Sequence, residues 1–188
     1  MGRLISKLIF EWLLGWKVTG FAAPKTLQHV CIAIPHTSNW DFFLGIFSRS
    51  IMRLNHVKFV AKNSLFRFPY GFIFRWLGGY PVDRSSSHNY VQGVAKLFRD
   101  YPEFSVCIAP EGTRKPTKKL KTGFYYIAKQ ANVPLIFVKF DFGTKTVDFS
   151  EPYYLSGDFE VDIQHILGHF RGVKGLHRTF DLEYPWKE

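Results

Sequence analysis

Short apolar runs rich in β-branched residues alternate along this chain with longer amphipathic segments, and this alternation constrains the fold more than any other feature. The runs at 29–35, 56–62, 104–110 and 133–142 have the length and composition of buried strands. The segments between them place apolar side chains at helical spacing. Strands that alternate with helices predict a single α/β domain, with a largely parallel central sheet flanked by helices.

The remaining expected elements follow from the same periodicities. Helices are expected at 4–18, 38–54, 86–100, 120–131 and 157–170, with a short aromatic helix and then a short strand within 68–82. A strand at 145–150 is expected to pair with the strand before it across Gly143.

Composition excludes several classes of protein. The chain has 188 residues, 46% hydrophobic and 21% charged, which suits one folded domain rather than a disordered tail. Its two cysteines, Cys31 and Cys107, lie in apolar runs, which excludes a disulfide scaffold and favours a reducing compartment. The net charge of +10 predicts an anionic partner: nucleic acid, a phosphorylated substrate or anionic lipid.

The N-terminal segment is amphipathic and carries two tryptophans. Lys7 and Glu11 interrupt its apolar stretch, so it does not have the pattern of a secretory signal. A helix lying in a membrane interface fits this pattern, and so does a helix docked on its own domain. We expect residues 1–20 to form an N-terminal amphipathic membrane-interface helix and 21–188 to form the main domain. The sequence has no uncharged apolar run long enough for a conventional transmembrane span.

A histidine and an aspartate follow the first buried strand. His36 comes directly after this strand, where open α/β sheets bind their ligands, and Asp41 lies five residues further on. A neutral imidazole can take a proton near pH 7, and a neighbouring carboxylate can fix its tautomer. Ser38 and Asp41 also match a helix capping box, which explains the aspartate without catalysis.

Two further polar segments follow apolar runs. Residues 109–116 gather Glu111, Thr113 and Arg114 in a turn constrained by glycine and proline, and such a turn can bind phosphate. Arg84 follows another short apolar run and could reach the same anion. The alternatives are a solvated basic turn and a surface ion pair of little energetic value.

In this order the motifs resemble the glycerophospholipid acyltransferase family, which includes the lysophosphatidic acid acyltransferases. That family carries H-x-x-x-x-D, a block ending in arginine, a Pro-Glu-Gly-Thr-Arg block and a Val-Pro block. The matching residues are His36 and Asp41, then Arg84, then Pro110-Glu111-Gly112-Thr113-Arg114, then Val133-Pro134. The resemblance covers about residues 30–140 and departs from the family's pattern at Pro35, Ala109 and Phe137.

The resemblance implies an O-acyltransferase. It would move a fatty acyl group from acyl carrier protein or coenzyme A to the hydroxyl of a phosphate-bearing lipid acceptor, such as a lysophospholipid. It implies His36 as general base and Asp41 as its orienting partner. It places Arg84, Glu111, Gly112, Thr113 and Arg114 in the acceptor site. The acyl thioester is a co-substrate, and neither a metal nor another cofactor is expected.

The expected partners are membrane lipid and the thioester donor, with no nucleic acid. An apolar anchor together with a basic loop favours the cytoplasmic face of a membrane, with the protein peripheral or monotopic. Two other functions remain open: a non-catalytic module that binds membranes or anionic lipid, and a thioesterase using the same His–Asp dyad.

Two other features have ordinary structural interpretations. His165 and His169 have the spacing of a helical metal pair, but the sequence offers no clear third ligand. The aromatic stretch from Phe66 to Trp76 fits a core segment better than an acyl groove.

Overall fold

A seven-stranded, mostly parallel sheet organises the molecule. The structure is a computed structural model that describes residues 2–82 and 86–186. The strands are β1 (Lys17–Gly20), β2 (Val30–Ile34), β3 (Val57–Lys62), β4 (Gly79–Val82), β5 (Ser105–Ile108), β6 (Leu135–Asp141) and β7 (Thr146–Phe149), in the order β1-β7-β6-β2-β5-β3-β4. Only β6 and β7 pair antiparallel, as the predicted hairpin across Gly143. The predicted α/β class and largely parallel sheet are confirmed.

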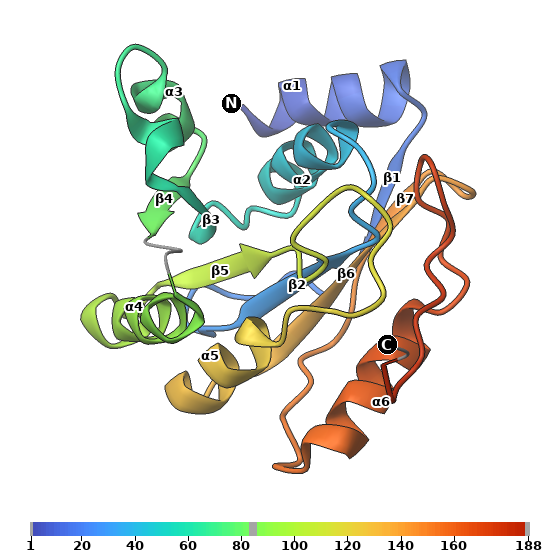
Figure 1. Cartoon of the computed structure of the whole chain (residues 1–188). Helices are drawn as coiled ribbons and strands as arrows, with labels where there is room; N and C mark the ends of the chain where they lie inside the picture. The colour runs from blue at the N-terminus through green and yellow to red at the C-terminus, as the bar shows by residue number, and fades with distance from the viewer. Residues whose placement is uncertain (1, 83–85, 187–188) are drawn as a thin grey trace.

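Helices cover both faces of the sheet (Figure 1). They are α1 (Arg3–Lys7), which continues as the π-helix η1 (Leu8–Leu13), α2 (Trp40–Ile51), the 3₁₀ turn η2 (Asn63–Phe66), α3 (Gly71–Trp76), α4 (Ser87–Asp100), α5 (Gly123–Ala131) and α6 (Phe159–Phe170). One apolar cluster joins the sheet to α4, α5 and α6, and a second joins its other face to α2 and the N-terminal segment.

Local sequence explains several of these elements. All five residues of β2 are buried, as a central strand covered on both faces requires. The Ser86 side chain accepts the amide N–H of Asn89 and caps α4, and Asp158 caps α6 in the same way. Asn132 ends α5 in the left-handed conformation with φ 53°.

The N-terminal segment has a docked face and an exposed face. The helix predicted over 4–18 ends at Leu13, and β1 then pairs in parallel with β7. Phe10 and Trp16 are buried in the second apolar cluster. Leu8 and Trp12 are 60% and 83% exposed. The docked interpretation therefore describes the buried face, and the membrane-interface interpretation of the exposed face stays a prediction.

The aromatic stretch at 66–76 differs from the core segment that the sequence favoured. Residues 63–76, which we call the aromatic arm, connect β3 to β4 and project from one end of the molecule (Figure 1). Phe66 is buried, but Phe68, Phe72 and Trp76 are 97%, 69% and 69% exposed. The arm lies at the edge of the sheet, where β4 is the last strand, so few neighbours are present to cover it.

Candidate active site

Two polar loops meet at one edge of the sheet. His36 follows β2, and the loop from Glu111 to Arg114 follows β5. These strands are parallel neighbours that pair Ile32 with Ile108, so their carboxyl ends lie at the same edge. The topology therefore brings together residues that are some seventy-five positions apart, as the His36–Glu111 contact shows.

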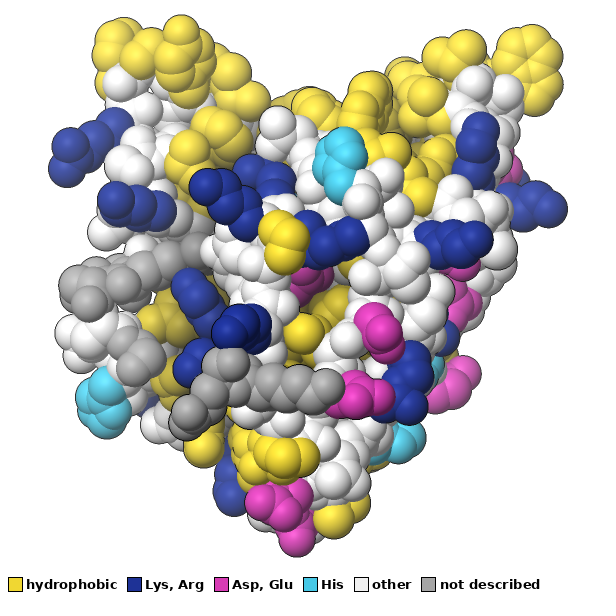
Figure 2. All heavy atoms as spheres, turned by 45° about the vertical axis from the view of Figure 1, so that its right-hand side comes forward, with side chains coloured by type: hydrophobic (Ala, Val, Ile, Leu, Met, Phe, Trp, Pro, Cys, Tyr) yellow, Lys and Arg dark blue, Asp and Glu magenta, His cyan; other side chains and the backbone are white. Residues whose placement is uncertain are grey.

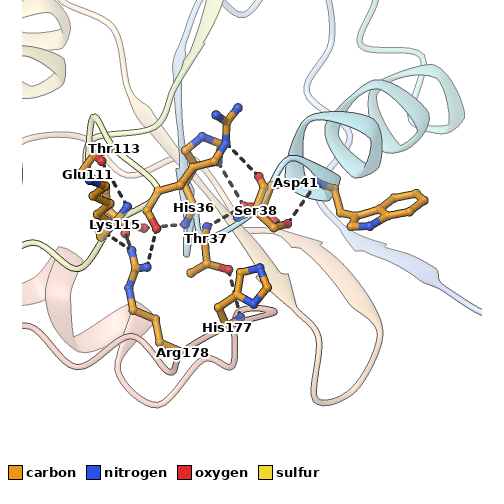
Figure 3. Close-up of polar contacts among 11 residues, drawn as sticks. His36, Thr37, Ser38, Asp41, Glu111, Thr113, Lys115, His177 and Arg178 are labelled. Atoms are coloured by element: carbon orange, nitrogen blue, oxygen red, sulfur yellow. Dashed lines mark hydrogen bonds and ion pairs between the residues drawn. The ribbon is translucent and has the colours of Figure 1, made fainter.

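His36 and Asp41 form the predicted pair (Figure 3). The Nδ1 of His36 lies 3.2 Å from the Oδ2 of Asp41. The same carboxylate accepts the amide N–H groups of Thr37 and Ser38 at 2.7 and 2.8 Å, and the Ser38 hydroxyl at 2.9 Å. Asp41 thus makes the backbone contact of a capping box and also holds the imidazole. The two interpretations of this aspartate are compatible.

The surroundings of Asp41 keep it ionised. Burial alone raises the pKa of this carboxyl, but hydrogen bonds from His36 and Ser38 outweigh that effect and hold its pKa below the usual value. The His36 side chain is 20% exposed. Because Nδ1 faces the carboxylate, Nε2 is the nitrogen that can accept a proton from a substrate.

Glu111 contacts the backbone of His36 rather than its imidazole ring. Its Oε1 accepts the backbone N–H of His36 at 2.5 Å, and its Oε2 accepts a hydrogen bond from Arg178 at 2.6 Å. Burial raises the pKa of Glu111, and these two donors oppose that rise only in part. Glu111 is not among the described residues that line the cavity beside the dyad. Its two contacts join the loop after β2 to the loop after β5 and to Arg178.

Arg178 is a site residue that sequence reasoning missed. Its guanidinium also donates to the backbone oxygens of Arg114 at 2.7 Å and Lys115 at 3.1 Å (Figure 3). It belongs to residues 172–180, which we call the C-terminal turn and which is closed by backbone bonds between its two sides. All three partners are more than sixty residues away, so no local pattern marks this arginine.

A cavity of about 780 Å³ opens beside the dyad. Its polar end is lined by His36, Asp41, Gly112, Thr113 and Arg114. The rest runs between α2, the sheet and the aromatic arm, and its lining is mostly apolar. That lining includes Ala33, Phe42, Ile46, Phe74, Val138 and Phe140.

Both cysteines line this cavity and are poor nucleophiles. Cys31 is buried, and burial raises its pKa well above the usual range. Burial raises the pKa of Cys107 to about 12. At neutral pH both thiols remain protonated, since a thiolate is the reactive form. Their prediction as buried thiols in apolar strands is confirmed for Cys31, and Cys107 is partly buried.

The other predicted site residues have different positions. Arg114 is exposed and its Nε donates to the backbone oxygen of Ser38 at 3.2 Å, which ties its loop to the start of α2. Gly112 has φ 67°, in the left-handed region that glycine favours. Arg84 lies outside the described residues. Val133 and Pro134 precede β6, at the sheet edge opposite His36.

The paired histidines of α6 have aromatic neighbours. The His165 ring stacks on Tyr153 with centroids 4.4 Å apart, and the His169 ring lies 4.7 Å from that of Phe137. Burial lowers the pKa of His169 to about 4. Within residues 2–82 and 86–186, no group of three or more His, Cys, Asp or Glu side chains is placed to hold a metal ion.

The fold and the site define an α/β protein with a His–Asp dyad at the polar end of a large apolar cavity. The sequence model of a family described as "Acyltransferase" matches residues 17–140. The chain belongs to this acyltransferase family, which confirms the resemblance given by the motifs. Comparisons with curated proteins and with solved structures found no match.

Proposed function

We propose that the protein is an O-acyltransferase that moves a fatty acyl group from a thioester of coenzyme A or acyl carrier protein to the hydroxyl of a phosphate-bearing lipid. The observation that carries this proposal is the position of the dyad at the polar end of the apolar cavity. An apolar cavity of this size suits an acyl chain, because burying methylene groups supplies binding free energy along its length. With the acyl chain in the cavity, the thioester carbonyl would lie next to His36.

In the proposed reaction, His36 is the general base. Its Nε2 takes the proton from the acceptor hydroxyl as that oxygen attacks the thioester carbonyl. The tetrahedral intermediate expels the thiolate, and the imidazolium returns the proton to that sulfur. The Asp41 carboxylate stabilises the imidazolium and keeps Nε2 directed at the substrate. An ester and a free thiol result, and the protein is unchanged.

The cations near the dyad support a phosphate-bearing acceptor. Arg114 lines the polar end of the cavity, and Lys115 follows it in the same loop. Arg114 lies against the start of α2 through its bond to Ser38, so it is held beside the dyad. A guanidinium can bind phosphate through two parallel hydrogen bonds.

The exposed apolar side chains near the N-terminus support peripheral association with a membrane. Leu4, Leu8, Trp12 and Leu13 are 60–85% exposed, although Phe10 between them is buried. Among the residues that the structure describes, none of the helices has the length and hydropathy needed to span a bilayer. We propose that α1 and η1 lie in the membrane interface through this exposed face.

The test of the base is replacement of His36. His36→Ala should lower kcat for acyl transfer by about 10²–10⁴-fold, the usual contribution of a general base. His88→Ala, at an exposed position on α4, is the matched control and should keep full activity. The assay combines a labelled acyl thioester with a lipid extract and identifies the product by mass. Undiminished transfer by the His36 variant would overturn its assigned role.

The same assay separates the proposal from its rivals. Free fatty acid as the main product, with acceptor present, would identify a thioesterase. Vesicle binding without turnover of any thioester would identify a non-catalytic module. Arg114→Ala should raise the KM for the acceptor by about tenfold and leave the KM for the donor unchanged. Lys119→Ala, in the same basic loop but not among the cavity-lining residues, serves as its control.

A further inference from the structure

We propose that the aromatic arm is a second membrane contact, separate from α1, and that the two contacts together hold the cavity against a bilayer containing anionic lipid. This inference rests on the proposed function, in which the bilayer supplies the lipid substrate. The arm is proposed to contact the bilayer itself. Contact with a second copy of the chain is the alternative that the test must exclude.

The arm has a folded base built around Phe66. Phe66 is buried, with its ring centroid 6.3 Å from that of Phe74. The Arg75 guanidinium lies 5.6 Å from the Phe66 ring and donates to the Phe66 backbone oxygen at 3.2 Å. A Cβ on Gly71 would lie 2.0 Å from that same oxygen, so only glycine fits this close turn. Specific packing and hydrogen-bond contacts therefore hold the base of the arm together.

Most of the exposed side chains of the arm are apolar. Six large apolar side chains within twelve residues are at least 38% exposed: Leu65, Phe68, Tyr70, Phe72, Ile73 and Trp76. Single exposed apolar residues are ordinary, but a cluster of this kind marks a surface that meets another apolar phase. Tyrosine and tryptophan among them are the residues that favour the boundary between lipid and water.

Charge identifies the kind of surface that the arm meets. Between Asp41 and Asp83 the sequence has six Lys or Arg residues and no Asp or Glu. Lys62, Arg67 and Arg75 of this stretch are exposed in or beside the arm. Cations beside exposed aromatic side chains match an anionic lipid surface, where each nearby cation adds attraction.

The cavity lies between the arm and α2, and α1 packs against α2. Figure 1 shows α1 and α3 at the same end of the molecule, with α2 below α1. Figure 2 shows the molecule turned about the vertical axis from Figure 1. Hydrophobic side chains gather at two raised points along its top, with a hollow between them and Lys and Arg side chains below. Leu65 and Phe74 of the arm line the cavity, as do Phe42 and Phe43 of α2.

This arrangement gives an acyl chain an apolar route from the bilayer into the cavity. Phe43 and Trp40, on α2, are about half exposed, at 50% and 55%. With the arm and α1 both in the interface, these side chains would face lipid rather than water. An acyl chain then avoids the cost of exposure to water while it moves to the dyad.

The test measures binding of the full chain to vesicles of phosphatidylcholine with phosphatidylglycerol. The double variant Phe68→Ser/Phe72→Ser should bind at least about tenfold more weakly than wild type, because two phenyl groups no longer enter the interface. The double variant Tyr154→Ser/Val161→Ser removes two exposed side chains near α6 and should bind like wild type. Lys62→Gln/Arg67→Gln should weaken binding to these vesicles and not to pure phosphatidylcholine.

The outcomes separate the arm from the proposed function. Wild-type vesicle binding by Phe68→Ser/Phe72→Ser would overturn the second contact, whatever the acyl-transfer activity. So would a change from dimer to monomer in light scattering with vesicle binding unchanged, since the arm would then join two copies. Loss of vesicle binding in the arm variants but not in the control variant, in a protein that turns over no thioester, would support the arm and overturn the proposed function.

Discussion

At the residue scale, two carboxylates of nearly equal burial behave in opposite ways. Asp41 and Glu111 are 2% and 3% exposed, and burial raises the pKa of each. Asp41 has four donors around it, which bring its pKa below the usual value. Glu111 accepts from one amide and one guanidinium, and its pKa stays raised. The number of hydrogen-bond donors thus decides whether the pKa of each carboxyl is lowered or raised. The pKa of Asp41 is lowered, so this aspartate stays ionised beside His36.

Arg178 is therefore expected to control the pH dependence of Glu111. Arg178→Ala removes a donor that opposes the raised pKa of this carboxyl, so its pKa should rise further. The variant leaves the buried Glu111 carboxyl without its charged partner, and it should lose about 2 kcal/mol of stability at pH 8. A carboxyl whose pKa is raised in the folded chain costs more stability as the pH rises, so this difference should shrink as the pH falls.

Two measurements check this assignment. The difference in Tm between wild type and Arg178→Ala should be largest near pH 8 and smallest near pH 4, and the acid limb of the kcat/KM profile should move to higher pH. Arg178→Lys keeps the charge but not the forked contacts to Arg114 and Lys115, so it should restore only part of the difference. A Tm difference that is constant with pH would assign Arg178 a purely structural role.

Local sequence could predict the pair of His36 and Asp41, but it could not predict the contacts that Glu111 and Arg178 make beside that pair. A polar residue directly after a buried strand points to the ligand-binding edge of a sheet, and that rule found both polar loops. It could not show that Glu111 faces the His36 amide instead of the cavity, because side-chain direction in a turn depends on neighbours from other strands. Arg178 has no signal in the sequence around it.

At the element scale, the N-terminal helix has a buried face and an exposed face, and we expect substitutions on the two faces to have different effects. Phe10→Ala, on the docked face, should lower stability by about 3–5 kcal/mol, because its ring is fully buried against Trp16 and Phe47. Trp12→Ala, on the exposed face, should leave Tm unchanged and weaken vesicle binding. Thermal denaturation and vesicle cosedimentation of the two variants measure this contrast. Equal loss of stability in both would show that the whole helix belongs to the core.

Periodicity predicted the long elements and failed at the short or edge elements. The five strands from β2 to β6 and the hairpin partner β7 follow from apolar runs and turn residues. β1 was not predicted, because Lys17–Gly20 is mostly exposed and exists through its pairing with β7, far along the chain. The aromatic arm was assigned to the core because composition cannot show that a segment lies beyond the last strand of a sheet.

At the scale of the whole molecule, the sheet topology assembles the site from three distant parts of the chain. Adjacent strands β2 and β5 bring the dyad and the basic loop together, and the C-terminal turn joins them from outside. A Cβ on Gly175 would lie 2.7 Å from a methyl carbon of Thr37, so the turn packs closely against the residue after His36. The matched family region ends at residue 140, whereas this third part lies beyond it.

The cavity connects all of these parts, and its length should set the acyl chain that the protein accepts. Gly45 of α2 lines the cavity, and a Cβ there would lie 3.7 Å from the Phe140 ring, an ordinary contact. Gly45→Ala should therefore be tolerated, whereas Gly45→Leu should fill the apolar end. For the leucine variant, kcat/KM should fall at least about tenfold with a long-chain thioester and little with a short one, because only the long chain needs that space. Competition between two chain lengths, with product masses counted, measures the ratio directly. An equal fall for both lengths would mean that the acyl chain does not enter this cavity.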